Sequence, residues 1–149
     1  MNEMDPCGLL VATRNAAKMQ ELLVLLADTS YKLLSLNEVP IDPEYEVEET
    51  GSTFEENAIL KAEGYGAISG MMTLADDSGL EVDALGGAPG VLSARYGNET
   101  LDDLGRNELV LKNVSGLPEE DLTARFRCCL LYTSDAADDT PCVDLGGRR

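Results

Sequence analysis

The 149-residue sequence contains no histidine, and this absence removes several kinds of catalytic site. Hydrolases in which a histidine activates a serine or a cysteine are excluded, and so are zinc sites with an imidazole ligand. Activation of a water molecule must therefore depend on a carboxylate, a lysine or a metal ion. The four cysteines form no C-x-x-C pair, which favours reduced thiols over a disulfide framework.

Basic residues are scarce, with 11 Lys and Arg against 28 Asp and Glu and a net charge of −17. A surface of this charge repels nucleic-acid backbones and anionic lipid, so we expect no polymeric nucleic-acid partner and no membrane partner. A small anionic substrate would need a local basic pocket, or a metal ion that bridges it to the acidic protein.

Long apolar runs are also missing, since none approaches the ~20 residues that a membrane-spanning helix requires. The first thirteen residues, MNEMDPCGLLVAT, carry acids where a signal peptide carries bases. We therefore expect a cytoplasmic protein.

Short apolar runs alternate with segments of helical periodicity, which predicts a single α/β domain whose sheet is at least partly parallel. Strands are expected over residues 8–12, 31–36, 71–75, 80–85 and 124–132, and an extended piece over 45–49. Helices are expected after Asn15, from Thr53 to Gly70, and over residues 101–114.

The second of these helices has the clearest sequence signal. Thr53 and Glu56 have the spacing of a capping box, which marks a helix start, and Gly70 suits a helix end. Apolar residues then recur at helical intervals and predict a buried stripe formed by Phe54, Ala58, Ala62 and Tyr65.

The segment TRNAAK, which follows the first strand, is one candidate site. Asn15 suits a helix N-cap, and Lys18 then lies in the first helical turn, where the helix dipole disfavours a cation. A phosphate bound by free backbone N–H groups and the Thr13 hydroxyl would explain the lysine. The alternative is an exposed lysine without a function.

The segment ADDSGL is a second candidate. Asp76 and Asp77 are adjacent acids, and such a pair marks either a site for a cation or a solvated turn, for which Asp-Ser-Gly is ordinary composition. Glu48 and Glu49, ahead of the second helix, can complete a magnesium site or form a solvated acidic loop.

Two further basic residues each allow two interpretations. Lys61 lies two turns into the second helix, where it can reach a phosphate or simply extend to solvent. Arg95 is either a phosphate contact or an ordinary surface residue. The Ser78 hydroxyl is the weakest candidate, as a nucleophile, because the chain has no histidine to activate it.

Four runs occur in the order and spacing of a known family: VATRNAAKMQELLVLL, EETGSTFEENAILKAEGY, LADDSGLEVDALGGAPGVLSARYG and ARFRCCLLY. From Leu9 to Tyr132 the chain resembles the Ham1/inosine triphosphatase family of nucleoside-triphosphate pyrophosphatases. The resemblance implies a cytosolic, magnesium-dependent, usually homodimeric enzyme that cleaves purine nucleoside triphosphates bearing hypoxanthine or xanthine to monophosphate and pyrophosphate. It also implies a mixed twisted sheet flanked by helices, in two lobes with the nucleotide between them.

The resemblance also implies roles for individual residues. The residues that would bind the triphosphate or touch the substrate are Thr13, Asn15, Lys18, Lys61 and Ser78. The residues that would hold Mg²⁺ are Glu49, Asp76 and Asp77, with Asp77 also the general base.

After Tyr132 the family continues with further strands, a Phe-Gly-Tyr-Asp run and a Ser-His-Arg motif, and the chain has neither motif. We expect a partial family domain over residues 1–132 that lacks the C-terminal part of the fold. Residues 133–149 are expected to be a disordered non-family tail, joined to a truncated gene by a frameshift or by an assembly or library artefact. The alternative is a protein that lost this region naturally, and resequencing would decide between them.

Two other functions stay open at this point. One is an inactive truncated fragment that retains only phosphate and magnesium binding. The other is a phosphoacceptor signalling domain, which also uses an acidic pair, although that pair is expected after the first strand.

Overall fold

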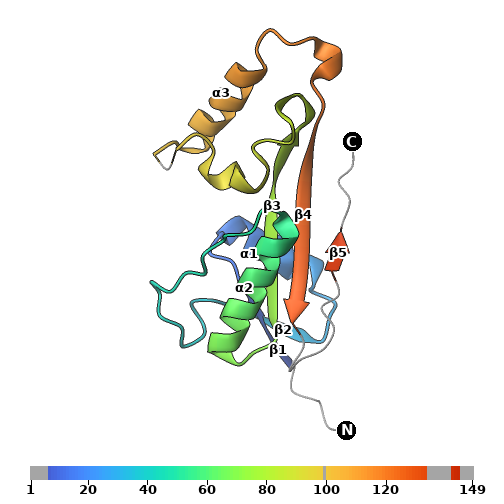
Figure 1. Ribbon diagram of the computed structural model, residues 1–149. Helices are drawn as coiled ribbons and strands as arrows, with labels where there is room; N and C mark the ends of the chain where they lie inside the picture. Colours follow the sequence, from blue (N-terminus) through green and yellow to red (C-terminus); the bar gives the residue numbers. More distant parts are fainter. Residues whose placement is uncertain (1–6, 99, 134–141, 145–149) are drawn as a thin grey trace.

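A mixed five-stranded sheet flanked by helices forms the frame of the molecule (Figure 1). The computed structural model describes residues 7–98, 100–133 and 142–144. Its strands are β1 (Cys7–Val11), β2 (Tyr31–Ser35), β3 (Thr73–Val82), β4 (Ala124–Thr133) and β5 (Cys142–Asp144). Its helices are α1 (Ala16–Leu25), α2 (Phe54–Ser69), α3 (Asp103–Val114) and the short 3₁₀ segments η1 (Asp83–Leu85), η2 (Gly90–Arg95) and η3 (Glu119–Asp121).

The strand order is β2-β1-β3-β4-β5. β1 runs parallel to β2 and β3, whereas β4 pairs antiparallel with β3 and β5. β3 and β4 extend from the part that contains α1 and α2 to the part that contains η2 and α3 (Figure 1). This arrangement confirms the expected mixed α/β fold.

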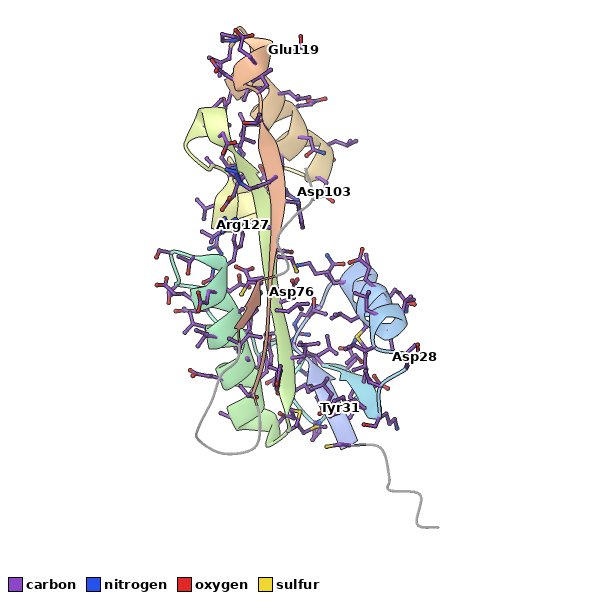
Figure 2. All side chains as sticks on the ribbon, turned by 90° about the vertical axis from the view of Figure 1, so that its right-hand side faces the viewer. Asp28, Tyr31, Asp76, Asp103, Glu119 and Arg127 are labelled. Atoms are coloured by element: carbon purple, nitrogen blue, oxygen red, sulfur yellow. The ribbon has the colours of Figure 1, made fainter. Side chains whose placement is uncertain are left out.

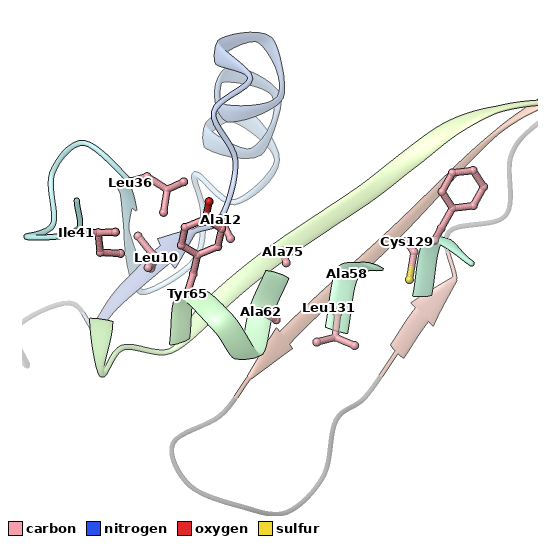
Figure 3. Close-up of a cluster of buried hydrophobic side chains, with 11 residues drawn as sticks. Leu10, Ala12, Leu36, Ile41, Ala58, Ala62, Tyr65, Ala75, Cys129 and Leu131 are labelled. Atoms are coloured by element: carbon pink, nitrogen blue, oxygen red, sulfur yellow. The ribbon is translucent and has the colours of Figure 1, made fainter. Parts of the chain in front are cut away.

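The core has two halves because side chains alternate between the faces of the sheet. On one face Leu9, Val11 and Leu74 pack with Leu22 of α1. The other face packs against α2, as Figure 3 shows. The buried residues of this second half of the core, from the sheet, from α2 and from the connections between them, include Leu10, Ala12, Ala58, Ala62, Tyr65, Ala75, Cys129 and Leu131. Each face of the sheet therefore has its own helix.

α2 begins and ends as its sequence predicts. The Thr53 side chain accepts a hydrogen bond from Glu56 N at 3.1 Å, and Gly70 ends the helix with φ of 67°. The Glu56 carboxylate reaches back as well, and its short bond is to Ser52 N at 2.6 Å, one residue before Thr53. The predicted apolar stripe is buried along its whole length.

The two strands expected over 71–75 and 80–85 merge into one strand, β3, which spans only Thr73–Val82, and residues 83–85 form η1 instead. The turn interpretation of Asp-Ser-Gly is wrong. β4 pairs with every residue of β3, from Thr73↔Thr133 to Val82↔Ala124, and this ladder keeps the intervening acids extended. Gly79 has a packing role, since a Cβ there would lie 2.6 Å from the carbonyl oxygen of Gly90. The glycine therefore allows η2 to approach the strand.

Most of the predicted tail, residues 134–141 and 145–149, lies outside the described residues. Within residues 133–149, Thr133 ends β4, and Cys142–Asp144 pair with Cys129–Leu131 as β5, a strand that the sequence did not predict. In the part of the chain that the structure describes, no helix combines the length and apolar character needed to cross a bilayer.

Candidate active site

One cavity of about 670 Å³ brings both candidate segments together. Figure 2 places Asp76 at the level where the part that contains α3 meets the part that contains α1. The cavity is lined by the eight residues to which the family resemblance assigns a role: Thr13, Asn15, Lys18, Glu49, Lys61, Asp76, Asp77 and Ser78. Glu48, the other acid considered for the magnesium site, is exposed and does not line it. Segments separated by up to 65 positions in the chain, from Thr13 to Ser78, thus converge on one space.

The start of α1 is capped by its own sequence. Asn15 Oδ1 accepts hydrogen bonds from Ala17 N at 2.9 Å and from Lys18 N at 3.3 Å. The Thr13 hydroxyl accepts from Asn15 N at 3.2 Å. The expectation of free backbone N–H groups at this helix start is therefore wrong for these three amides, because side-chain oxygens already bind them.

Lys18 reaches across the sheet face to β3. Its ammonium forms an ion pair with Asp76 Oδ2 and donates to the Ser78 hydroxyl at 2.6 Å. The other oxygen of Asp76 accepts from the Cys128 thiol at 3.0 Å, and burial with the nearby Asp76 raises the pKa of Cys128 to about 12. The Asp76 carboxylate thus provides the negative partner that the sequence position of Lys18 requires.

Lys61 occupies the opposite face of β3. Its ammonium lies 3.2 Å from Asp77 Oδ1 and 3.4 Å from Glu49 Oε1, and only 13% of its side chain is exposed. The interpretation of Lys61 as a solvent-directed side chain is wrong. Burial raises the pKa of Asp77 above its usual value; the Lys61 charge opposes the rise, and the Glu49 charge adds to it.

The acids do not form a single cluster. Because side chains alternate along β3, Asp76 faces Lys18 and Asp77 faces Lys61 with Glu49. Among the described residues, no three acidic, cysteine or histidine side chains lie close enough together to hold one metal ion. The expected set of Glu49, Asp76 and Asp77 is therefore divided between the two faces of the strand.

Glu49 and Asp77 nevertheless suit a magnesium ion. Their oxygens bracket the same ammonium, and Asp77 Oδ2 is buried without a hydrogen-bond partner in the described part of the chain. Mg²⁺ commonly uses one or two carboxylates and takes its remaining ligands from water and substrate phosphates. The Glu49 and Asp77 carboxylates therefore match, in number and in chemistry, the protein ligands that Mg²⁺ commonly uses.

Two arginines bind the backbone of the acidic segment 45–49 beside the cavity. Arg14 donates to the carbonyl of Tyr45 at 2.9 Å, and Arg95 donates to the carbonyl of Glu49 at 3.4 Å. The sequence suggested a phosphate contact or a surface residue for Arg95, and the structure shows an exposed side chain that lines the cavity. The extended piece expected over 45–49 is not a strand.

Sequence reasoning missed two residues that contact this site. Cys128 binds Asp76 from β4, and Asn57 of α2 lies beside Asp77. The β3–β4 register places Cys128 opposite Ser78, and this pairing is not visible in the sequence. Asn57 had a usable signal, because it precedes Lys61 by one helical turn and thus lies on the same face of α2.

The fold and the cavity define an α/β protein with two lysine–carboxylate pairs on the two faces of one central strand. The chain belongs to the Ham1 family, whose model matches residues 9–147. It is 47% identical over 121 residues to a dITP/XTP pyrophosphatase of Bacillus licheniformis, an alignment that covers 81% of this chain and 61% of that relative. It is 44% identical over 137 residues to the dITP/XTP pyrophosphatase of Escherichia coli O157:H7, covering 92% of this chain and 68% of that protein.

Solved structures agree with this assignment. The Staphylococcus aureus Ham1 protein superposes with a TM-score of 0.78 at 37% identity, over 92% of this chain and 68% of that one. A HAM1 protein from Coxiella burnetii superposes with a TM-score of 0.80 at 35% identity, over 93% of this chain and 70% of that one. The chain thus spans about two thirds of the length of these relatives.

Proposed function

We propose that this chain hydrolyses non-standard purine nucleoside triphosphates, such as those of hypoxanthine and xanthine, to the nucleoside monophosphate and pyrophosphate. The observation that carries the proposal is the shared cavity, which is lined by the α1 start, two lysines and the carboxylates of β3. The pyrophosphatase names of the relatives at 44% to 47% identity support the same reaction.

The two lysines suit a triphosphate in an otherwise acidic protein. Lys18 enters the cavity from the α1 side of β3 and Lys61 from the α2 side, and neither is fully exposed. Phosphate oxygens that enter between them would share each ammonium with the carboxylate that it now contacts. The Thr13 and Ser78 hydroxyls and the Asn15 side chain line the same space and can bind further phosphate or substrate oxygens.

Asp77 is the best candidate for the group that orients and deprotonates the attacking water. Its Oδ1 is held by Lys61, while its buried Oδ2 has no partner among the described residues. Because burial raises its pKa, the ionised carboxylate is a stronger base than an exposed aspartate. The proton of the attacking water would move to this carboxylate as the water oxygen bonds to the α-phosphorus and pyrophosphate leaves.

We propose Mg²⁺ as the cofactor, held by Glu49 and Asp77. When bound, the ion would screen phosphate charge and lower the pKa of a coordinated water. Asp76 has a different proposed duty, because its carboxylate fixes the Lys18 ammonium beside Ser78.

A pyrophosphate-release assay tests the proposal directly. The chain is incubated with inosine triphosphate, with and without Mg²⁺, beside a version restored to the full length of its relatives. Release of equal amounts of inosine monophosphate and pyrophosphate that depends on Mg²⁺ supports the proposal. Release of inorganic phosphate alone, or turnover unaffected by chelation of the metal, contradicts it.

A second candidate function is binding of the triphosphate without turnover. The chain spans 61% of the Bacillus licheniformis relative and lacks the two C-terminal motifs expected to hold base and ribose. A fragment that binds triphosphate and Mg²⁺ without turnover would bind inosine triphosphate in calorimetry yet release no pyrophosphate. A phosphoacceptor domain would instead become phosphorylated by a small phosphodonor, which identifies that third function.

We also propose a cytoplasmic location and a homodimer. The substrates belong to the nucleotide pool, and the strong negative charge disfavours nucleic-acid and membrane partners. Exposed apolar side chains, among them Val24, Leu25, Leu104 and Leu111, provide surface that a second copy can cover. Sedimentation at several protein concentrations tests the dimer.

A further inference from the structure

Asn57 is a polar side chain that the core of the molecule fully encloses. It lies in α2 with 0% of its surface exposed, among the apolar residues that pack against β3. Its Oδ1 accepts a hydrogen bond from Gly51 N at 2.8 Å. A buried amide is costly unless it is hydrogen-bonded, so the position of Asn57 needs a physical reason.

The NH₂ group of the Asn57 side chain lies on the side of Asp77, in the site described above. In the described part of the chain, the buried side-chain atoms without a hydrogen-bond partner are Asn57 Nδ2 and Asp77 Oδ2, one donor and one acceptor. Asn57 precedes Lys61 by one turn of α2, and Lys61 binds the other oxygen of Asp77 at 3.2 Å. The amide also lowers the pKa of Asp77, against the larger effect of burial.

The Asn57–Gly51 bond restrains the segment that carries Glu49. Gly51 follows Glu49 by two residues, and a Cβ at position 51 would lie 2.6 Å from Asn57 Oδ1. This close approach is open only to glycine unless the segment moves. The backbone after Glu49 is therefore positioned from the core by a side chain that also lies beside Asp77.

We propose that Asn57 is a positioning residue that ties the Glu49 segment to Asp77 and so fixes the two carboxylates on either side of Lys61. Oδ1 accepts from Gly51 N, and in the proposed tie Nδ2, which has no other partner among the described residues, donates to Asp77 Oδ2. A carboxylate oxygen has two lone pairs, so Asp77 Oδ2 can accept from Asn57 and still bind a ligand. The inference rests on the proposed function, in which Glu49 and Asp77 act together.

Hydrogen exchange of the nucleotide-free chain, followed by mass spectrometry, tests the tie without reference to activity. Asn57→Leu has similar volume but no polar atoms, and amide exchange over residues 48–51 should rise by about tenfold. Exchange in β3 should stay unchanged. Asn57→Asp keeps the acceptor for Gly51, so exchange over 48–51 should stay within about twofold of the parent while the magnesium requirement changes.

Gly51→Ala tests the same bond from the other side without altering the core. Exchange over 48–51 should rise as in Asn57→Leu, because a Cβ at position 51 would lie 2.6 Å from both Asn57 Oδ1 and Glu56 Cβ, so the segment must move away from α2. Gly66→Ala is the matched control, since a Cβ there would meet its nearest neighbours at 3.4 Å or beyond. In the two disruptive variants, the Mg²⁺ concentration for half-maximal pyrophosphate release should also rise by about tenfold.

Parental exchange at residues 48–51 in Asn57→Leu would overturn the inference. Equal acceleration over α2, β3 and 48–51 would also overturn it, because that pattern defines a residue that only packs. An unchanged magnesium requirement in an active Asn57→Leu would contradict the link to Asp77. If the parent releases no pyrophosphate, the proposed function fails, and hydrogen exchange still decides whether Asn57 restrains the Glu49 segment.

Discussion

Asp76 and Asp77 are adjacent in the chain, yet they bind lysines on opposite faces of β3. Asp76 pairs with Lys18 of α1, and Asp77 pairs with Lys61 of α2 at 3.2 Å. The alternation of a strand, and not a turn, produces this division. Two neighbouring carboxylates can therefore have separate duties, one as an anchor for Lys18 and one at the centre of the proposed chemistry.

Replacement of the proposed base tests that division. Asp77→Asn should lower kcat by about 10²–10⁴-fold, because the amide cannot accept the proton of the attacking water. The fold should persist, since the amide has the same shape. Asp83→Asn is the control, because Asp83 is exposed and binds Thr123 and Arg125 away from the cavity. Parental turnover in Asp77→Asn would end the catalytic assignment.

Removal of the α1 lysine should affect binding more than turnover. Lys18→Ala should raise the KM for nucleotide by about tenfold, since one charged phosphate contact is lost. It should also lower the Tm, because it leaves the buried Asp76 carboxylate without its ammonium partner.

The double variant Lys18→Ala with Asp76→Asn separates these two effects. It should recover most of the lost Tm, since no unpaired charge remains, but it should keep the raised KM. Recovery of parental KM in the double variant would show that Lys18 acts only as a partner of Asp76.

The raised pKa of Asp77 should be visible in the pH dependence of stability. Below the unfolded pKa, about 3.9, the carboxyl is protonated in both states and carries no penalty. As the pH rises through the raised native pKa, ionisation in the buried site costs stability, which is lost progressively. Asp77→Asn should therefore have a higher Tm than the parent at pH 7, with the gap closing below about pH 4. Thermal unfolding from pH 3 to 8 measures this, and a constant gap would contradict it.

Cys128 should be an unreactive thiol. Its pKa is raised to about 12 from an ordinary 9.0, so the fraction of Cys128 present as thiolate at neutral pH is roughly a thousandfold lower than for an ordinary cysteine. Iodoacetamide should label it far more slowly than the exposed Cys7, as followed by tandem mass spectrometry. Asp76→Asn should accelerate the labelling, because Asp76 helps to raise this pKa. Equal labelling rates at Cys7 and Cys128 would contradict the half-buried placement of the Cys128 thiol beside Asp76.

Local patterns predicted most of the elements. Thr53, Gly70 and the stripe from Phe54 to Tyr65 defined α2 because caps and periodicity act within one helix. The continuity of β3 was not predictable, because it depends on β4, a partner that begins more than 40 residues later. The hydrogen bonds to β4 outweigh the tendency of Asp-Ser-Gly to form a turn. The sequence of β3 alone does not show that β4 is its partner.

The candidate site was predicted as a set of residues but not as an arrangement. The family resemblance selected side chains that line one cavity, including Glu49 and Lys61, which are distant from the aspartates in sequence. Which acid faces which lysine depends on the face of β3 that each residue occupies. The contacts of Asn57 and Cys128 required the packing of α2 and the register of β4.

The central claim is that one cavity binds a triphosphate and cleaves it next to Asp77. The most direct measurement is simultaneous detection of inosine monophosphate and pyrophosphate from inosine triphosphate, for the parent and for Asp77→Asn. We predict equimolar products from the parent with Mg²⁺, and loss of both on chelation or in Asp77→Asn. Absence of both products from the parent, while a full-length relative is active in the same assay, would contradict the claim.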